Sequence, residues 1–200
     1  MKKSILISIK PRFVADILNG KKTIELRKTM PKCELPIDVY IYCTKGTPRA
    51  ILTDKGCVLA NKLPVGGDSP YKSAYSLEGQ VVAKFTLNKV EQQPIWPRYS
   101  DVPLNWQVEQ KLDKLCLTKD EVYDYGGNDD DEYLACLWYI DNLEVFDDPK
   151  EFYEHCYKWT DKKIEWYTGF KPVRVLVSLR RPPQSWAYIG WEDEVEEDEA

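Results

Sequence analysis

The chain is poor in metal-binding residue types and in long apolar runs, and both shortages narrow what it can be. His155 is the single histidine among 200 residues, and the six cysteines include no C-x-x-C pair. The sequence therefore lacks the clustered cysteine and histidine ligands from which a typical zinc site is built. No apolar run approaches the roughly 20 residues that a membrane-spanning helix requires. We expect no metal, no cofactor and no membrane partner.

The N-terminus and the cysteines indicate a protein of the cell interior. The opening segment MKKSILISIKPR has too short an apolar core for a signal peptide and turns charged at once. A disulfide framework is not expected in a chain of this size without a secretion signal. Cys43 and Cys136 lie inside apolar strand patterns, which favours small core residues. We expect a cytoplasmic protein.

Length and composition favour one globular domain. A chain of 200 residues with 43% hydrophobic and 12% aromatic residues can bury a substantial core. We expect a single domain over residues 1–190, with insertions near 53–78 and 92–131. Residues 191–200 are expected to form a disordered acidic tail.

The net charge of −5 hides a strong asymmetry along the chain. Residues 1–63 hold 13 lysines and arginines against 5 acids, whereas residues 101–160 hold 5 against 16. The last ten residues add seven acids and no base. A protein whose overall sign repels nucleic acid can still bind it through a basic face. Lysines that only keep an acidic protein soluble give the same pattern, so charge alone does not separate the two interpretations.

A short helix is predicted close to the N-terminus. Residues Pro11–Asn19 carry apolar side chains at helical spacing, and a proline in the first turn suits a helix start. Gly20 is placed to end the helix in a left-handed conformation.

A strand with a charged face is predicted directly after this helix. Thr23–Arg27 alternates, so its two apolar residues face one side while Thr23, Glu25 and Arg27 face the other. Lys22 lies at the junction of helix and strand. The helix and the strand thus place a lysine, a glutamate and an arginine close together. One interpretation of this pattern is a polar binding or catalytic site. A half-solvated strand with no special role is the other.

Several ordered motifs resemble those of a known family. The sequence GKKTIELR over Gly20–Arg27 resembles the G-x-K-x-x-E-x-R signature of the ASCH domain, a member of the PUA-like superfamily. The resemblance is to bacterial and phage members and extends, in pieces, over residues 4–91 and 132–189. The other segments that carry it are Ser8–Pro11, Val39–Lys45, Gly79–Phe85 and Arg181–Tyr188.

The resemblance and the strand patterns imply an α+β fold. We expect a PUA-like mixed, mostly antiparallel β-barrel of about five or six strands, with the Pro11–Asn19 helix across one end and helical insertions. The expected strands are Ser4–Ile9, Thr23–Arg27, Ile37–Cys43, Gly79–Glu91, Tyr133–Phe146 (bent near Asp141–Asn142) and Val173–Leu179. The expected further helices are Asn105–Leu115, Lys119–Tyr125 after an N-cap at Thr118, and Lys150–Cys156.

The remaining segments are predicted to be irregular. Residues 53–78 are rich in glycine and proline and are expected to form an excursion with one short strand at Cys57–Ala60. Gln92–Pro103 reads as a proline-rich connection, and Gly126–Asp131 as an acidic loop that lacks the ligand spacing of an EF-hand. In family members, the segment that Arg180–Ile189 resembles crosses the barrel mouth.

The resemblance implies RNA or nucleotide binding in a basic cleft beside the signature helix. Lysine and arginine there are suited to phosphate, and Glu25 can accept a hydrogen bond from a base amino group or orient the lysine. The residues expected to bind the ligand are Lys10, Lys22, Glu25, Arg27, Thr44, Lys45, Gln184, Ser185 and Trp186.

Three aromatic residues have two interpretations. Trp138, Tyr139 and Trp186 offer faces on which bases can stack, with about 1–3 kcal/mol per base. Tryptophan and tyrosine also commonly fill cores with one polar edge satisfied, and this alternative is favoured for each of them.

A metal-independent hydrolase is the alternative to a binding protein. One branch of the family resembles amidohydrolases that act on acetylated cytidine, in which a lysine activates a threonine at the position of Glu25. Here Lys22 is retained, but Thr23 is two positions away. Lys22 and Glu25 are the catalytic candidates if the protein is an enzyme, and ribonuclease activity is the second hydrolytic version. Binding is favoured because the hydroxyl nucleophile is missing from its matching position.

A protein partner is a third possibility, through the acidic middle region or the tail. An acidic tail can also mimic nucleic acid and shield a basic face of the same chain. Deletion of residues 192–199 distinguishes a tail that shields the basic face from a tail without a role. If the tail shields that face, the shortened chain binds RNA more tightly.

Overall fold

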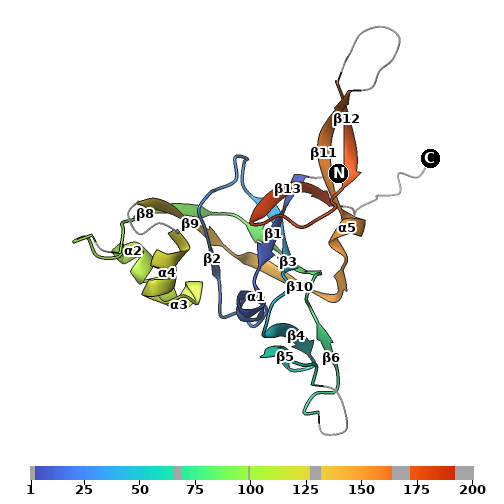
Figure 1. Ribbon diagram of the computed structural model, residues 1–200, viewed down its shortest axis with the longest axis horizontal. Coiled ribbons are helices and arrows are strands. Elements are labelled where there is room, and N and C mark those ends of the chain that lie inside the picture. Colours follow the sequence, from blue (N-terminus) through green and yellow to red (C-terminus); the bar gives the residue numbers. More distant parts are fainter. Residues whose placement is uncertain (1–2, 65–68, 99, 127–131, 164–171, 192–200) are drawn as a thin grey trace.

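Figure 1 shows the computed structural model, which describes residues 3–64, 69–98, 100–126, 132–163 and 172–191. The strands are β1 Lys3–Ile9, β2 Ile24–Arg27, β3 Ile37–Cys43, β4 Arg49–Thr53, β5 Gly56–Ala60, β6 Ala74–Ser76, β7 Val81–Leu87, β8 Val90–Ile95, β9 Tyr133–Tyr139, β10 Asp141–Lys150, β11 Cys156–Lys163, β12 Pro172–Ser178 and β13 Trp186–Trp191. The helices are α1 Pro11–Leu18, α2 Trp106–Glu109, α3 Leu112–Leu115, α4 Lys119–Gly126 and α5 Phe152–His155.

A mixed, seven-stranded sheet forms the centre of the molecule. Its strand order is β10-β7-β3-β1-β13-β11-β12, with β1 parallel to β3 and the other neighbours antiparallel. Ile5, Leu6 and Ile7 of β1 are fully buried, as expected for a strand covered on both faces. On one face, Val14 and Ile17 of α1 pack into the same core as Val39 and Phe85.

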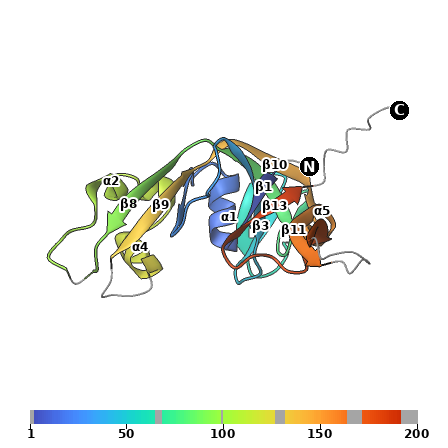
Figure 2. The same ribbon diagram turned by 90° about the horizontal axis from the view of Figure 1, so that it is seen from above.

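A second sheet carries the helical insertion away from the centre. Its order is β2-β9-β8, and β9 runs into β10 of the main sheet through the single residue Ile140. The bend predicted near Asp141–Asn142 is confirmed, because Asn142 has a left-handed φ of 48°. Figures 1 and 2 show β8, β9 and the helices α2 and α4 to one side of the main sheet, with α1 between them. A core of its own, including Leu104, Val108 and Leu115, holds these helices on the sheet.

The strands are mixed and mostly antiparallel, as predicted, but the described pairings do not close them into a barrel. The segment after β2 and strand β13 meet through side chains. Trp186 Nε1 donates to Thr29 Oγ1 at 3.0 Å, and Lys32 N donates to the Tyr188 hydroxyl at 2.6 Å. We call these contacts of Thr29 and Lys32 with Trp186 and Tyr188 the side-chain seam.

The irregular segments contain more strand than predicted. The expected long strand over 79–91 is two, because β7 ends at Leu87 and β8 begins at Val90 and enters the proline-rich connection. Pro94 is tolerated there because, among the described strands, β8 pairs with β9 alone and lies at the edge of its sheet. Likewise, Pro149 lies within β10 at the edge of the main sheet, and the helix expected over 150–156 shortens to α5.

Other expected boundaries also change. The helix expected over 105–115 is two single turns, α2 and α3, and the stretch that begins at Arg49 forms a three-stranded sheet in the order β5-β4-β6. The segment expected to cross a barrel mouth ends as strand β13, antiparallel to β1. Most of the acidic loop and of the acidic tail, residues 127–131 and 192–200, lies outside the described residues. None of the helices in the described residues combines the length and apolar character needed to cross a bilayer.

Asn19 ties the end of α1 to the three-stranded sheet. Gly20 follows with a φ of +72°, which is the predicted left-handed helix end. The Asn19 amide donates to Cys57 O at 2.7 Å, and its Oδ1 accepts from Cys57 N at 3.0 Å. A single side chain thus satisfies both backbone groups of a residue in β5.

Replacement of Asn19 by alanine is expected to lower the free energy of unfolding by about 1–3 kcal/mol, since both bonds are lost together. Urea denaturation followed by circular dichroism measures the change. Asn61→Ala is the control, because Asn61 is exposed. Equal stability of the Asn19 variant and the parent chain would contradict a structural role for this bridge.

Candidate functional site

Lys22, Glu25 and Arg27 form a buried ionic cluster at the junction of α1 and β2. The turn that follows α1 is fixed by the backbone, because the amides of Lys21 and Lys22 both donate to Asp16 O, at 2.9 and 3.0 Å. Lys22 is 2% exposed, Glu25 6% and Arg27 7%. The half-solvated interpretation of this strand is therefore wrong, and its charged face points inward.

The Glu25 carboxylate lies between the two cations. Its Oε2 is 3.3 Å from Lys22 Nζ, and its Oε1 is 3.1 Å from Arg27 Nη2. Buried charges of this kind persist only when each has a partner, because desolvation costs several kcal/mol per ion. We call this arrangement the Glu25 clamp.

The cations of the clamp are also bonded to the backbone of distant elements. Lys22 Nζ donates to Leu115 O at 2.5 Å and so ties the helical insertion to β2. Arg27 donates to Ser8 O at 2.8 Å and to Ser185 Oγ at 3.2 Å. Lys22 and Arg27 both form hydrogen bonds and ion pairs within the protein. These contacts argue against the prediction that the two cations are available to bind phosphate.

Two atoms of the clamp keep unused hydrogen-bonding capacity. Glu25 Oε2 and Arg27 Nε are buried and have no hydrogen-bond partner among the described residues. The contact of Oε2 with Lys22 Nζ counts as an ion pair but lacks hydrogen-bond geometry. A buried carboxylate oxygen without a donor is costly, and a ligand that supplies one would relieve the cost.

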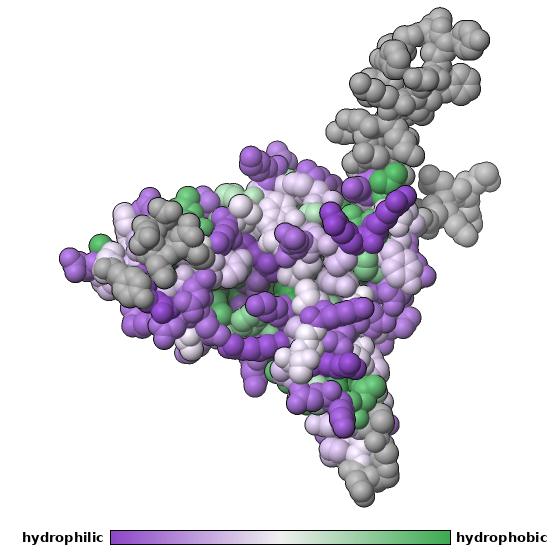
Figure 3. Space-filling model, viewed as in Figure 1, coloured by the Kyte–Doolittle hydropathy of each residue, from purple (hydrophilic) through white to green (hydrophobic). Residues whose placement is uncertain are grey.

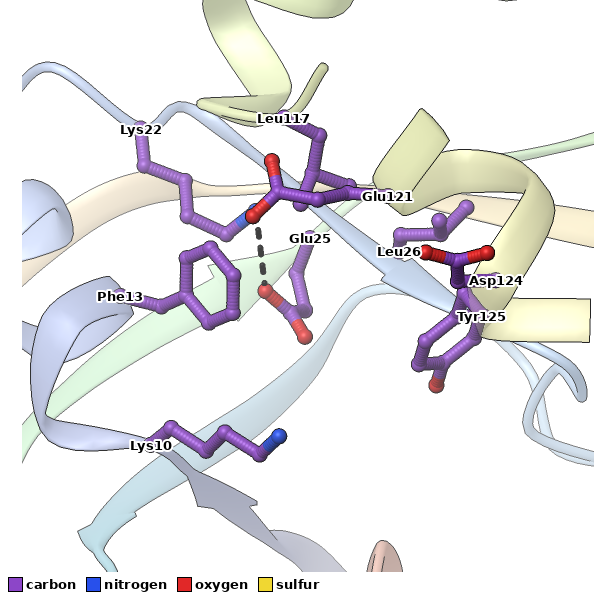
Figure 4. A pocket seen from close by; sticks show the side chains of 9 residues that line it. All are labelled: Lys10, Phe13, Lys22, Glu25, Leu26, Leu117, Glu121, Asp124 and Tyr125. Carbon is purple, nitrogen blue, oxygen red and sulfur yellow. Dashed lines mark ion pairs between the residues drawn. The ribbon is translucent and has the colours of Figure 1, made fainter. Parts of the chain in front are cut away.

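A pocket of about 350 Å³ opens directly onto Glu25 (Figure 4). Glu25 lies centrally in this view, with Phe13 of α1 on one side and Tyr125 of α4 on the other. Lys22 and Lys10 reach toward the same space from above and below. The remaining lining residues are Leu26 of β2 together with Leu117, Glu121 and Asp124 of the insertion.

Helix α4, which contributes part of the pocket lining, begins with a capping box. Thr118 Oγ1 accepts from Glu121 N at 3.2 Å, and Glu121 Oε2 accepts from Thr118 N at 2.8 Å, which confirms Thr118 as an N-cap. Arg12 of α1 pairs with Glu121 Oε1 at 2.5 Å and lowers the pKa of that carboxyl group. The same glutamate therefore begins α4, joins it to α1 and lines the pocket.

Tyr125 supplies the hydroxyl group of the pocket wall. Burial, more than any neighbouring charge, raises the pKa of this phenol above its ordinary value. The hydroxyl therefore remains protonated and able to donate a hydrogen bond at neutral pH. Opposite it, Phe13 lies against the Lys22 ammonium, 5.0 Å from the ring centroid.

The pocket is mixed in charge, in contrast to the expected basic cleft. Lys10 and Lys22 contribute two cations to its lining, whereas Glu25, Glu121 and Asp124 contribute three carboxylates. A polyanion gains little from such a lining, but a neutral ligand with several hydrogen-bond donors is well matched.

The other predicted site residues divide into two groups. Ser185 reaches the clamp through its bond to Arg27, and Trp186 joins the side-chain seam beside it. Thr44 and Lys45 follow β3 and do not line the pocket, and Gln184 lines a different groove.

The aromatic predictions also divide. Trp138 is fully buried and packs against Trp186, with 5.4 Å between ring centroids, so core packing is confirmed for Trp138. Tyr139 lies beneath Lys89 at the far end of β9, with 4.8 Å from the ammonium to the ring centroid. Neither residue lines the pocket.

Six of the nine residues that line the pocket are not among the predicted ligand-binding residues. Phe13 was recognised only as an apolar helix residue, and Leu117, Glu121, Asp124 and Tyr125 were recognised only as part of a helical insertion. The predicted N-cap at Thr118 located α4 in the sequence. Nothing local indicated that α4 packs opposite α1, because that depends on the distant contact between Arg12 and Glu121.

Solved structures show which fold this is. The crystal structure of ASCH from Zymomonas mobilis matches with a TM-score of 0.51 and 17% identity, over 92% of this chain and 86% of that chain. A serine-to-alanine mutant of the same protein gives 0.52 and 15% identity, over 92% of this chain and 87% of that chain. No protein-family model matches the sequence. No curated protein matches it. The chain has the strand-rich α+β fold of these ASCH structures, as the GKKTIELR motif predicted.

Replacement of Glu25 by glutamine is expected to destabilise the protein by about 3–5 kcal/mol, because two buried cations lose their shared anion. Chemical denaturation measures the loss. Glu144→Gln is the matched control, since Glu144 pairs with Lys84 at 3.2 Å but its side chain is 59% exposed. We expect a cost of about 0–1 kcal/mol there. Similar losses in the two variants would contradict the clamp.

Proposed function

We propose that the protein binds RNA and receives one nucleobase in the pocket above Glu25. The observation that carries the proposal is the Glu25 carboxylate: Glu25 lines the pocket, and its buried Oε2 has no hydrogen-bond partner in the described part of the chain. An exocyclic amino group, as on cytosine, is a donor of the kind this oxygen lacks. The ASCH fold and the signature support an RNA-related ligand.

The shape and lining of the pocket fit a base better than a phosphate. Its volume of about 350 Å³ is at the small end of ligand pockets, which suits a single nucleoside. Phe13 and Tyr125 border it on opposite sides and offer aromatic surface for stacking. The three lining carboxylates repel a phosphate but accept hydrogen bonds from a base.

Lys10 completes the proposed site at its open end. It is exposed, and its ammonium group has no hydrogen-bond or ion-pair partner among the described side chains. Lys22 and Arg27 are fixed in the clamp, whereas Lys10 lines the pocket and is available for a ligand phosphate or ribose.

Hydrolysis is the weaker proposal on this geometry. Thr23 is exposed and does not line the pocket, so the hydroxyl nearest in sequence to the hydrolytic branch's nucleophile faces elsewhere. Among the described lining residues, the hydroxyl belongs to Tyr125, whose raised pKa opposes the formation of a nucleophilic phenolate.

Cytidine is expected to bind about tenfold or more tightly than uridine, because uridine presents a carbonyl oxygen where cytidine presents the amino group. Isothermal titration of the full chain with each nucleoside measures the ratio. Phe13→Leu should weaken both nucleosides alike by removing the ring on which they stack. Tyr75→Leu, on the distant β6 strand, is the control for loss of a partly exposed aromatic residue. Equal affinity for cytidine and uridine would overturn the role of Glu25.

The purified protein is expected to leave acetylated cytidine and a short single-stranded RNA unchanged. Chromatography of both reactions, with a test for released acetate, provides the measurement. If acetate or RNA fragments are released by the parent chain and not by Glu25→Gln, the protein is an enzyme and the binding proposal fails.

A further inference from the structure

A second concave surface lies where strands β11, β12 and β13 meet. It is a groove of about 950 Å³, formed by the end of β12, the segment that connects it to β13, and the side chain of Lys158. The backbone there is fixed, because Leu179 N donates to Cys156 O at 2.8 Å. Strongly hydrophilic side chains gather in Figure 3 over the region where Figure 1 places β13.

The described lining of this groove is basic. Lys158, Arg180 and Arg181 line it, and no acidic side chain stands among its described lining residues. All three are exposed, and their charged groups have no ion pair or hydrogen bond with another described residue. In contrast to the clamp cations, these groups are available to an external anion. Arginine in particular can bind a phosphate through two parallel hydrogen bonds.

The segment that presents the two arginines is anchored to the clamp. Ser8 Oγ donates to Pro183 O at 2.6 Å, and Ser8 N donates to Ser185 O at 2.8 Å. Arg27 donates to Ser185 Oγ at 3.2 Å and pairs with Glu25 at 3.1 Å. The segment that borders the basic groove and the carboxylate that lines the base pocket are thus connected through one guanidinium group.

We infer that the basic groove binds the phosphate backbone of the single-stranded RNA whose base occupies the pocket. The inference rests on the proposed function and extends it from one nucleoside to a strand. The nucleotides that flank the bound base would place their phosphates on Arg180, Arg181 and Lys158. Affinity would then come mainly from this groove, and base preference from Glu25.

The test compares a nucleoside with an oligonucleotide. Fluorescence anisotropy measures the binding of a six-nucleotide cytidine-rich RNA at several salt concentrations, and calorimetry measures cytidine. We expect the double variant Arg180→Ala, Arg181→Ala to weaken oligonucleotide binding about tenfold or more and to reduce the salt slope by about 1.4. Cytidine binding should not change. Lys62→Ala, Lys72→Ala, two exposed lysines beside β5 and β6, is the charge-matched control and should change neither.

The outcomes separate the two proposals. If cytidine binds but the oligonucleotide binds no more tightly, or loses no affinity in the double arginine variant, the groove assignment is wrong and the base pocket stands. If cytidine does not bind while the double variant still weakens the oligonucleotide, the groove stands and the base pocket is wrong. If the lysine control weakens the oligonucleotide as much as the arginine variant, the groove has no specific role.

Discussion

One carboxylate between two buried cations fixes the arrangement of the elements that meet at the junction of α1 and β2. Glu25 pairs with both Lys22 and Arg27, and each cation also donates to the backbone of a distant element, at Leu115 and Ser8. Three separate segments, the helical insertion, β1 and the loop before β13, are therefore positioned relative to β2 by a single charge. Such a cluster contributes geometric specificity at a considerable desolvation cost, because each ion is removed from water.

The elements that could be predicted from the sequence are those whose boundaries are marked by residues within or next to them. Residues Ile37–Cys43 were bounded correctly because an apolar run lies between prolines and a turn, and Gly20 marked the helix end because its backbone is left-handed. The charged residues Lys22, Glu25 and Arg27 could be predicted as a cluster because they lie within six positions at the junction of a helix and a strand. Their burial could not be predicted, since alternation looks the same whether the polar face meets water or another wall of protein.

The predictions were wrong where the local structure or the lining of the site depends on contacts between segments far apart in the sequence. Pro94 indicated an irregular connection and Pro149 the start of a helix, yet among the described strands both lie at the edge of a sheet, where the outer side needs no backbone donor. The expectation of a basic cleft followed from the family resemblance, with the basic composition of residues 1–63 in support. It could not include Glu121 and Asp124, which lie in the acidic part of the sequence and reach the pocket only through tertiary packing.

The side-chain seam beside β13 has a consequence for how this architecture can diverge. A backbone ladder demands a fixed register on both sides, whereas the bonds of Thr29 and Lys32 to Trp186 and Tyr188 constrain only a few positions. Insertions or deletions in the flanking loops can therefore accumulate without breaking main-chain pairing. The Zymomonas mobilis structures share this fold at 15–17% identity, so the topology does not depend on most of the particular residues found here.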